Sequence, residues 1–121
     1  MERKRTESEK KLKKALAQIK ETLVLVEGKR DKTALEALGC KSVLAVAGRK
    51  NQLRELVKDK KVIVMTDLDK PGNELAKMIR GELEGAAKVD CETRRVFGEV
   101  LKLKYFEDIK RKYEKFCEEG E

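Results

Sequence analysis

The chain has 121 residues, of which 30 are Lys or Arg and 23 are Asp or Glu, so its formal net charge is +7. This length suits a single domain, and the excess of positive charge favours a polyanionic partner such as nucleic acid. The sequence contains no histidine, which excludes histidine general bases and most transition-metal sites.

The positive charge is concentrated near the start of the chain. Residues 1–20 hold eight basic and three acidic residues, which accounts for five of the seven net charges. Within this segment apolar residues recur at helical spacing, which predicts an amphipathic helix over residues 4–20 that packs on the rest of the domain. The apolar positions are Leu12, Ala15, Leu16 and Ile19.

The apolar runs and the cysteines predict the cellular compartment of the protein. No apolar run approaches the roughly 18 residues of a membrane span, and the N-terminus lacks a signal-peptide core, so we expect a cytoplasmic protein with no membrane partner. Cys40, Cys91 and Cys117 lack the paired spacing of a zinc site, and we expect them to be core residues in a reducing compartment. Abundant Lys and Glu with a single Pro are typical of thermophile proteins.

The first half of the chain alternates short apolar runs with helical patterns. Strands are predicted at residues 23–26 and 42–46 because both are continuous apolar runs. Between them Asp31 is expected to cap a helix over residues 32–38 that ends at Gly39. A further helix is expected after Asn51, with Leu53, Leu56 and Val57 buried.

The second half continues the alternation. The apolar, β-branched run after Lys61 predicts a third strand buried on both faces, and Pro71 suits the first turn of a helix that runs to about Glu84. A fourth strand is expected over residues 86–91. Residues 93–103 fit either a short helix or an edge strand, and an amphipathic helix is expected over residues 106–117.

Strands that alternate with helices predict an α/β fold. We expect a three-layer, Rossmann-like arrangement in which a four-stranded, mainly parallel sheet of order 2-1-3-4 carries helices on both faces. In such sheets binding sites form beyond the carboxyl ends of the strands, where the strand order reverses. The first and third strands meet there, so the residues that follow them are the first candidates for a site.

Carboxylates follow both of these strands. Asp67 and Asp69 are alternate residues after the third strand, so their backbones lie about 6.6 Å apart and their side chains share one direction. Glu27 follows the first strand directly. A D-x-D pair also occurs in solvated turns, but three carboxylates at one edge repel one another unless a cation lies between them. Mg²⁺ suits such oxygen ligands, with Mn²⁺ as an alternative.

Two segments resemble the two signatures of the Toprim domain, which topoisomerases, bacterial-type primases and some small nucleases share. They are Val-Leu-Val-Glu-Gly-Lys-Arg-Asp at residues 24–31 and Thr-Asp-Leu-Asp-Lys-Pro-Gly at residues 66–72. The sequence is most similar to the small primase-like Toprim proteins and to the ribonuclease that trims 5S ribosomal RNA precursors. The resemblance implies a single Toprim domain with its core at residues 22–91, preceded by the basic helix of residues 1–21 and followed by a helical extension over residues 92–121.

The resemblance also implies Mg²⁺-dependent phosphodiester chemistry. Asp67 and Asp69 would be metal ligands, while Glu27 would act as general acid or base and could also contact the metal. Topoisomerase-type members often carry a third acid where this chain has Pro71, so a topoisomerase-like site is not expected. Independently of the family, Glu27 suits proton transfer because it stands apart from the aspartate pair.

Basic residues and glycines surround these acids in the predicted loops. The basic residues would hold backbone phosphates; they are Lys29, Arg30, Arg49, Lys50 and Lys70. The other expected components of the site shape its loops; they are Gly28, which would permit a tight turn, Asp31, Gly48 and Gly72.

These features favour a small metal-dependent nuclease that acts on RNA or DNA, with RNA processing favoured by the resemblance. One alternative is a non-catalytic, metal-dependent nucleic-acid-binding or assembly module of a replication, repair or RNA-processing complex. Another is primase-like nucleotidyl transfer, although the sequence shows no surface for nucleotide binding. Phosphate-loop and dinucleotide-binding glycine motifs are absent.

Overall fold

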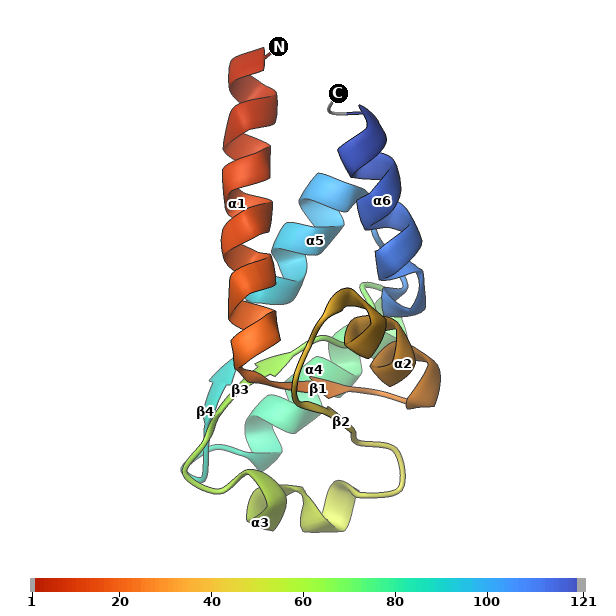
Figure 1. Cartoon of the computed structure of the whole chain (residues 1–121). Coiled ribbons are helices and arrows are strands. Elements are labelled where there is room, and N and C mark those ends of the chain that lie inside the picture. The colour runs from red at the N-terminus through yellow and green to blue at the C-terminus, as the bar shows by residue number, and fades with distance from the viewer. Residues whose placement is uncertain (1, 120–121) are drawn as a thin grey trace.

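The structure, a computed structural model, describes residues 2–119, with side chains from residue 7 onward (Figure 1). The basic side chains of residues 3–5 therefore lie outside the described part. The helices are α1 (Glu2–Glu21), α2 (Lys29–Leu38), α3 (Leu53–Val57), α4 (Lys70–Glu82), α5 (Thr93–Leu101) and α6 (Ile109–Glu119), with 3₁₀ turns η1 (Lys50–Gln52) and η2 (Phe106–Asp108). The strands are β1 (Leu23–Val26), β2 (Val43–Ala45), β3 (Lys61–Val64) and β4 (Lys88–Asp90).

The four strands form one sheet in the order β2-β1-β3-β4, and all neighbouring pairs are parallel. Val24 of β1 lies opposite Val43 of β2 on one side and Ile63 of β3 on the other, and these pairs define the register of β1 against both neighbours. The predicted α/β class and strand order are confirmed. The reversal of strand order falls between β1 and β3, as the sequence indicated.

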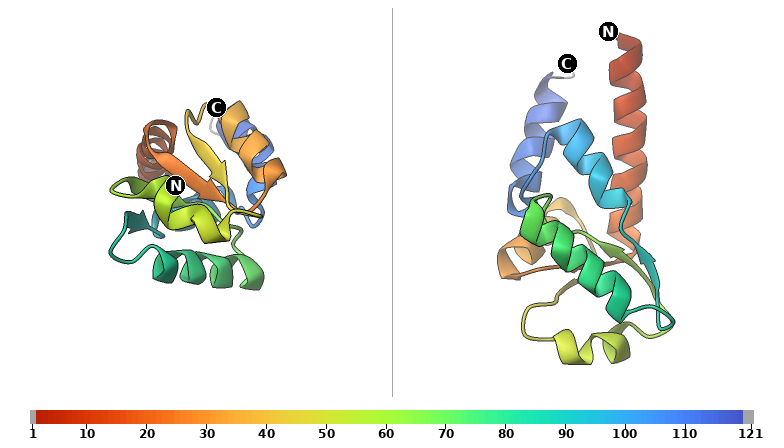
Figure 2. Two further views of the ribbon diagram at one scale, coloured as in Figure 1. Left: turned by 90° about the horizontal axis from the view of Figure 1, so that it is seen from below. Right: turned by 180° about the vertical axis from the view of Figure 1, so that it is seen from behind.

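Successive residues of the central strands supply two separate cores. Val24, Val26 and Ile63 face a cluster formed with α1, α2, α5 and α6, whereas Leu25 and Val64 face a second cluster with α3 and α4. Figure 1 and the views of Figure 2 show these two helical layers on opposite sides of the sheet. Because both faces are covered, the strands read as continuous apolar runs.

Several local expectations were wrong. Helix α2 begins at Lys29, so Asp31 is its third residue and does not cap it; Asp31 instead accepts a hydrogen bond from the Gly28 amide at 3.3 Å. Gly28 lies in extended backbone that other residues also adopt, so it is not needed for a tight turn. The helix α3 is preceded by η1 without a cap from Asn51, and Leu56 is 40% exposed.

The segment after β4 is helical, which settles the ambiguity at residues 93–103. Asp90 accepts hydrogen bonds from the amides of Glu92 (2.8 Å) and Thr93 (2.9 Å) and from the Thr93 hydroxyl (2.7 Å), so its carboxylate holds the start of α5. The expectation of buried cysteines is confirmed only for Cys40, since Cys117 is exposed. Among the described helices, none combines the length and apolar character that a membrane crossing requires.

Candidate metal and nucleic-acid site

Four carboxylates gather where β1 and β3 end, and we call this set the acidic edge: Glu27, Asp31, Asp67 and Asp69. Glu27 is exposed directly after β1, and Asp67 is half-buried beyond β3. The charges of Glu27, Asp31 and Asp69 all act on Asp67. Among the described residues no ion pair involves any member of the acidic edge. The fold therefore brings together negative charges that no neighbouring cation neutralises directly.

Asp67 is the most strongly perturbed member. Burial raises its pKa to about 6 from 3.8, the hydrogen bond from the Phe106 amide opposes this rise, and the charges of Asp31, Asp69 and Glu27 add to it. The Phe106 amide donates to Asp67 Oδ1 at 2.8 Å, which ties the acid to the segment before α6. Removing this carboxyl group from water disfavours its charged form, which is the usual effect of burial on an acid.

Asp69 and Gly72 shape the loop between β3 and α4. Asp69 caps α4, with Oδ1 accepting from the Gly72 amide at 2.8 Å. A Cβ atom on Gly72 would overlap the carbonyl oxygen of Asp67, so the close return of the chain requires glycine here. The buried Thr66 hydroxyl donates to the Gly72 carbonyl at 2.7 Å and closes the loop.

A buried arginine holds this loop from the other side. Arg94, on α5, is 6% exposed and donates to the carbonyls of Thr66 (3.1 Å) and Asp67 (2.6 Å). It also donates to Asn73 Oδ1 on α4 at 2.7 Å. One guanidinium thus joins the end of β3 to two helices and fixes the backbone that carries Asp67.

Asp31 adds a second perturbed acid. Its pKa is raised by burial, lowered by the hydrogen bond from the Gly28 amide, and raised by the charges of Glu27 and Glu107. Glu107 belongs to η2, so the C-terminal segment contributes charge as well as the Phe106 amide. Arg30 approaches Glu107 at 3.9 Å across this side of the edge.

The acidic edge suits a loosely held divalent cation and does not form a closed coordination cage. Within residues 2–119 no three acidic or cysteine side chains come close enough together to hold a metal ion by themselves. Oδ1 of Asp67 and Oδ1 of Asp69 each accept a backbone hydrogen bond, which leaves Oδ2 of each to coordinate a metal ion. Mg²⁺ needs only one or two carboxylates because it keeps several waters and also binds substrate phosphate.

The predicted basic residues are divided among three places. Lys29 and Arg30 line a cavity of about 630 Å³ between α2 and the start of α6, which Lys110 also lines. Lys70 borders a second cavity beside Asp69. Arg49 and Lys50 are exposed beyond the edge strand β2, in a turn where Gly48 has φ +79°, and line neither cavity.

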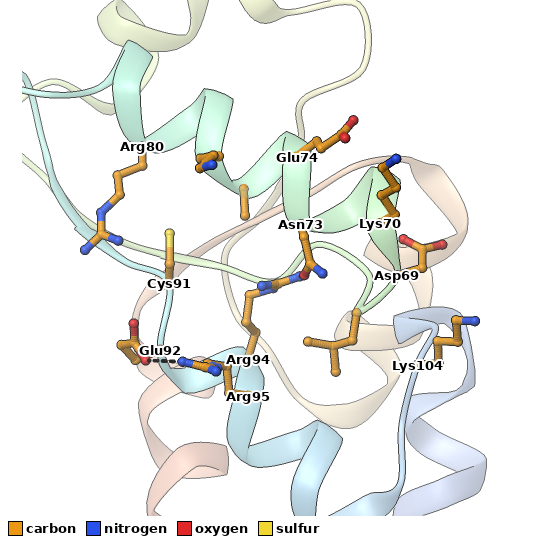
Figure 3. A pocket seen from close by; sticks show the side chains of 13 residues that line it. Asp69, Lys70, Asn73, Glu74, Arg80, Cys91, Glu92, Arg94, Arg95 and Lys104 are labelled. Carbon is orange, nitrogen blue, oxygen red and sulfur yellow. Dashed lines mark hydrogen bonds and ion pairs between the residues drawn. The ribbon is translucent and has the colours of Figure 1, made fainter.

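The second cavity, of about 660 Å³, lies between α4 and the β4–α5 junction, and we call it the α4 groove (Figure 3). It is lined by Leu68, Asp69, Lys70, Asn73, Glu74, Ala76, Lys77, Arg80, Cys91, Glu92, Arg94, Arg95 and Lys104. Most of these lining residues could not be identified from the sequence. The helical spacing of Lys70, Lys77 and Arg80 was the available signal, whereas nothing local marks Arg94, whose partners are 21 or more residues away.

Comparison with known proteins agrees with the fold. A model of the Toprim domain matches residues 21–93. A UPF0292 protein of Pyrococcus abyssi is 38% identical over 97 residues, which cover 74% of this chain and 73% of that protein. A UPF0292 protein of Thermococcus sibiricus is 32% identical over 119 residues, covering 91% and 94%. A solved structure of a protein from Aquifex aeolicus superposes with a TM-score of 0.69 at 28% identity, covering 80% of this chain and 96% of that one.

Proposed function

We propose, from the premise that this chain belongs to the Toprim domain family, that it is a metal-dependent nuclease that hydrolyses phosphodiester bonds in RNA or DNA. Of these two substrates we favour RNA, in an RNA-processing role. The observation that carries the proposal is the acidic edge itself, where four carboxylates lie at the strand-order reversal without an ion-pair partner in the described part of the chain. Carboxylates in such a cluster repel phosphate, so a bound cation is needed before the phosphate to be cleaved can lie among them.

Asp67 and Asp69 would hold this cation through the oxygens that the backbone leaves free, with Mg²⁺ or Mn²⁺ as the ion. When bound, the ion supplies charge that polarises the phosphoryl oxygen and lowers the pKa of water. The chain's own residues set the geometry: Arg94 and the Phe106 amide fix the position of Asp67, and Gly72 fixes that of Asp69. Glu27, exposed at the end of β1, would exchange a proton with the attacking water or the leaving oxygen.

The proposal is tested by cleavage of end-labelled structured RNA, single-stranded DNA and duplex DNA with Mg²⁺, Mn²⁺ or EDTA. Glu27→Gln should reduce metal-dependent cutting by about 10²-fold or more, the usual contribution of a positioned acid or base. Asp67→Asn, which removes a ligand of the cation, should reduce it as well, by weakening the hold on the ion that polarises the phosphate. Glu55→Gln, which removes an exposed carboxylate on α3, should cut like the native protein. Cutting that persists in Asp67→Asn would contradict the assigned site.

A second candidate is a metal-dependent nucleic-acid-binding module without turnover. The finding that favours it is that, within the described residues, no three acidic or cysteine side chains lie close enough together to hold a metal ion by themselves. A loosely held ion can bridge a protein and a phosphate without catalysing cleavage. The same assay separates the two. Mg²⁺-dependent retention of labelled RNA with no cutting on any substrate would support the binding module and contradict the nuclease.

A further inference from the structure

We propose that the α4 groove holds the phosphodiester backbone of one nucleic-acid strand and leads it to the acidic edge. This inference rests on the proposed function, because it describes how the substrate reaches the same site. It concerns a surface on the β4 side of the edge, away from Lys29, Arg30, Arg49 and Lys50. The shared chemistry is a row of phosphates, which either RNA or DNA supplies.

Charge is the first observation. Six cations line the groove against three acids; the cations are Lys70, Lys77, Arg80, Arg94, Arg95 and Lys104, and the acids are Asp69, Glu74 and Glu92. In the described part of the chain only Arg95 among these cations forms an ion pair, with Glu92 at 3.4 Å. Arg94 donates to neutral oxygens only. The exposed cations Lys70, Lys77 and Arg80 of α4 have no ion-pair partner among the described residues, so their charge remains available to a ligand.

Shape and direction are the second observation. Lys70, Lys77 and Arg80 follow one another along α4, and the ten steps from residue 70 to residue 80 span about 15 Å at 1.5 Å per residue. Figure 3 shows Arg80 at the end near Cys91 and Glu92, and Lys70, Asp69 and Lys104 at the other end. The groove thus runs from the β4–α5 junction to a member of the acidic edge. For a strand whose bases stay stacked as in B-DNA, with a rise of about 3.4 Å per nucleotide, this length corresponds to about four nucleotides.

The lining also discriminates between occupants. Sites for free nucleotides and other small ligands are mostly apolar, with few polar groups, whereas this groove is lined mainly by charged side chains and contains no aromatic residue on which a base could stack. Sequence-tolerant strand grooves usually combine positive charge with stacking. Without stacking, affinity must come from phosphate contacts, so binding should depend strongly on salt and little on base sequence.

The test measures binding without cleavage. Fluorescence anisotropy of labelled 12-nucleotide single-stranded RNA and DNA, and of the matching duplexes, is recorded in EDTA over a range of salt concentrations. The doubly substituted chain Lys77→Gln/Arg80→Gln removes two exposed groove charges that the acidic edge does not use. The matched control, Lys58→Gln/Lys60→Gln, removes two exposed charges just before β3, at the opposite end of that strand from Asp67.

We expect the groove variant to bind the single strands about fivefold more weakly or worse. Its slope of log affinity against log salt should fall by about 1.4, the value for two phosphate contacts on a single strand. The control should keep the native slope. Equal affinity and slope for the groove variant and the native chain would overturn the proposal. It would equally fail if a nucleoside triphosphate displaced the 12-mer at lower concentration than a tetranucleotide does, because the occupant would then be a free nucleotide.

The outcome is separable from that of the proposed function. Binding in EDTA does not require turnover, so a groove that binds strands in a chain that never cuts would overturn the nuclease and leave the groove in place. Conversely, metal-dependent cutting with native strand affinity in the groove variant would keep the nuclease and overturn the groove. RNA and DNA arms that give the same slope identify the backbone as the feature recognised.

Discussion

Asp67 is held in a position that disfavours its own charge. Burial raises its pKa to about 6, against 3.8 in the unfolded chain, even though the Phe106 amide bonds to it. Between these two values the folded protein binds more protons than the unfolded one, so its stability falls as pH rises. Above pH 6 the ionised Asp67 carboxylate lowers the stability of the fold by its full amount, and below about pH 4 this destabilisation disappears. A cation at the acidic edge would offset this cost.

The first prediction concerns Asp67→Asn in EDTA. Asparagine keeps an oxygen for the Phe106 amide but carries no charge, so this variant should be more stable than the native chain at pH 8, by about 1–3 kcal/mol. The difference should vanish at or below about pH 4. Urea unfolding at both pH values measures it, with Glu55→Gln as a control that should match native at pH 8. A native chain that is the more stable one at pH 8 would show that Asp67 stabilises the fold.

Gly72 gives a second residue-scale prediction. A methyl group at this position would overlap the Asp67 carbonyl, so Gly72→Ala must displace the loop that carries both aspartates. We expect a loss of about 1–3 kcal/mol or more in the free energy of unfolding. The matched control is Gly81→Ala in the last turn of the same helix, where a Cβ meets nothing within 4 Å. It should be neutral or stabilising by about 0.5–1 kcal/mol. Equal stabilities in chemical unfolding would argue against the close approach.

At the scale of elements, α5 is attached to the sheet by polar contacts as well as by its apolar face. Arg94 links it to the carbonyls of Thr66 and Asp67 and to Asn73 of α4, while Phe97 and Leu101 pack into the core. The carbonyls that Arg94 satisfies belong to the chain just beyond β3, where no strand continues the ladder. The helix therefore completes the hydrogen bonding of the loop that forms the candidate site.

The third prediction is that Arg94→Met destabilises the protein by about 2–4 kcal/mol, because it removes three hydrogen bonds from a charged group and leaves buried carbonyls unsatisfied. Arg95→Met, the next residue but exposed, should change stability by no more than about 0.5 kcal/mol. Thermal and urea unfolding of both variants measure the difference. Similar losses in the two would mean that burial of Arg94 contributes no more than the surface contact of Arg95.

Elements were predictable from the sequence where the pattern is local. The strand at residues 23–26 could be read directly because each residue is apolar and both faces are covered. Residues 93–101 stayed ambiguous although the start of their helix is also set locally. Asp90 accepts bonds from the amides of Glu92 and Thr93, and hydrophobic periodicity does not report such a cap. The expected burial of Leu56 was wrong because α3, which spans only five residues, buries Leu53 and Val57 and leaves Leu56 40% exposed.

At the scale of the whole molecule, the candidate site draws on more of the chain than the two motifs. The acids at residues 27, 67 and 69 were predictable because parallel strands end at one edge. Their supports were not, since Arg94, the Phe106 amide and the Lys104 carbonyl, which accepts from the Leu68 amide at 2.7 Å, come from segments far along the chain. The Toprim match ends at residue 93, before all three of these supports.

The last prediction is therefore that the segment after β4 is part of the folding unit and not an appendage to a core at residues 22–91. Five buried apolar side chains follow residue 91 on one face of the sheet: Phe97, Leu101, Leu103, Phe106 and Ile109. Each contributes about 1.5–3 kcal/mol by burial. Their sum matches the whole stability of a typical domain, about 5–15 kcal/mol.

A chain shortened to residues 1–91 should consequently show no cooperative thermal transition by circular dichroism, whereas a chain shortened only to residue 117 should unfold like the full one because Glu118 and Glu119 are exposed. Phe106→Ala in the full chain is the intermediate case, with an expected loss of about 3–5 kcal/mol. A cooperative transition in the 1–91 chain would establish an independent core and would require Asp67 to be held without the Phe106 amide.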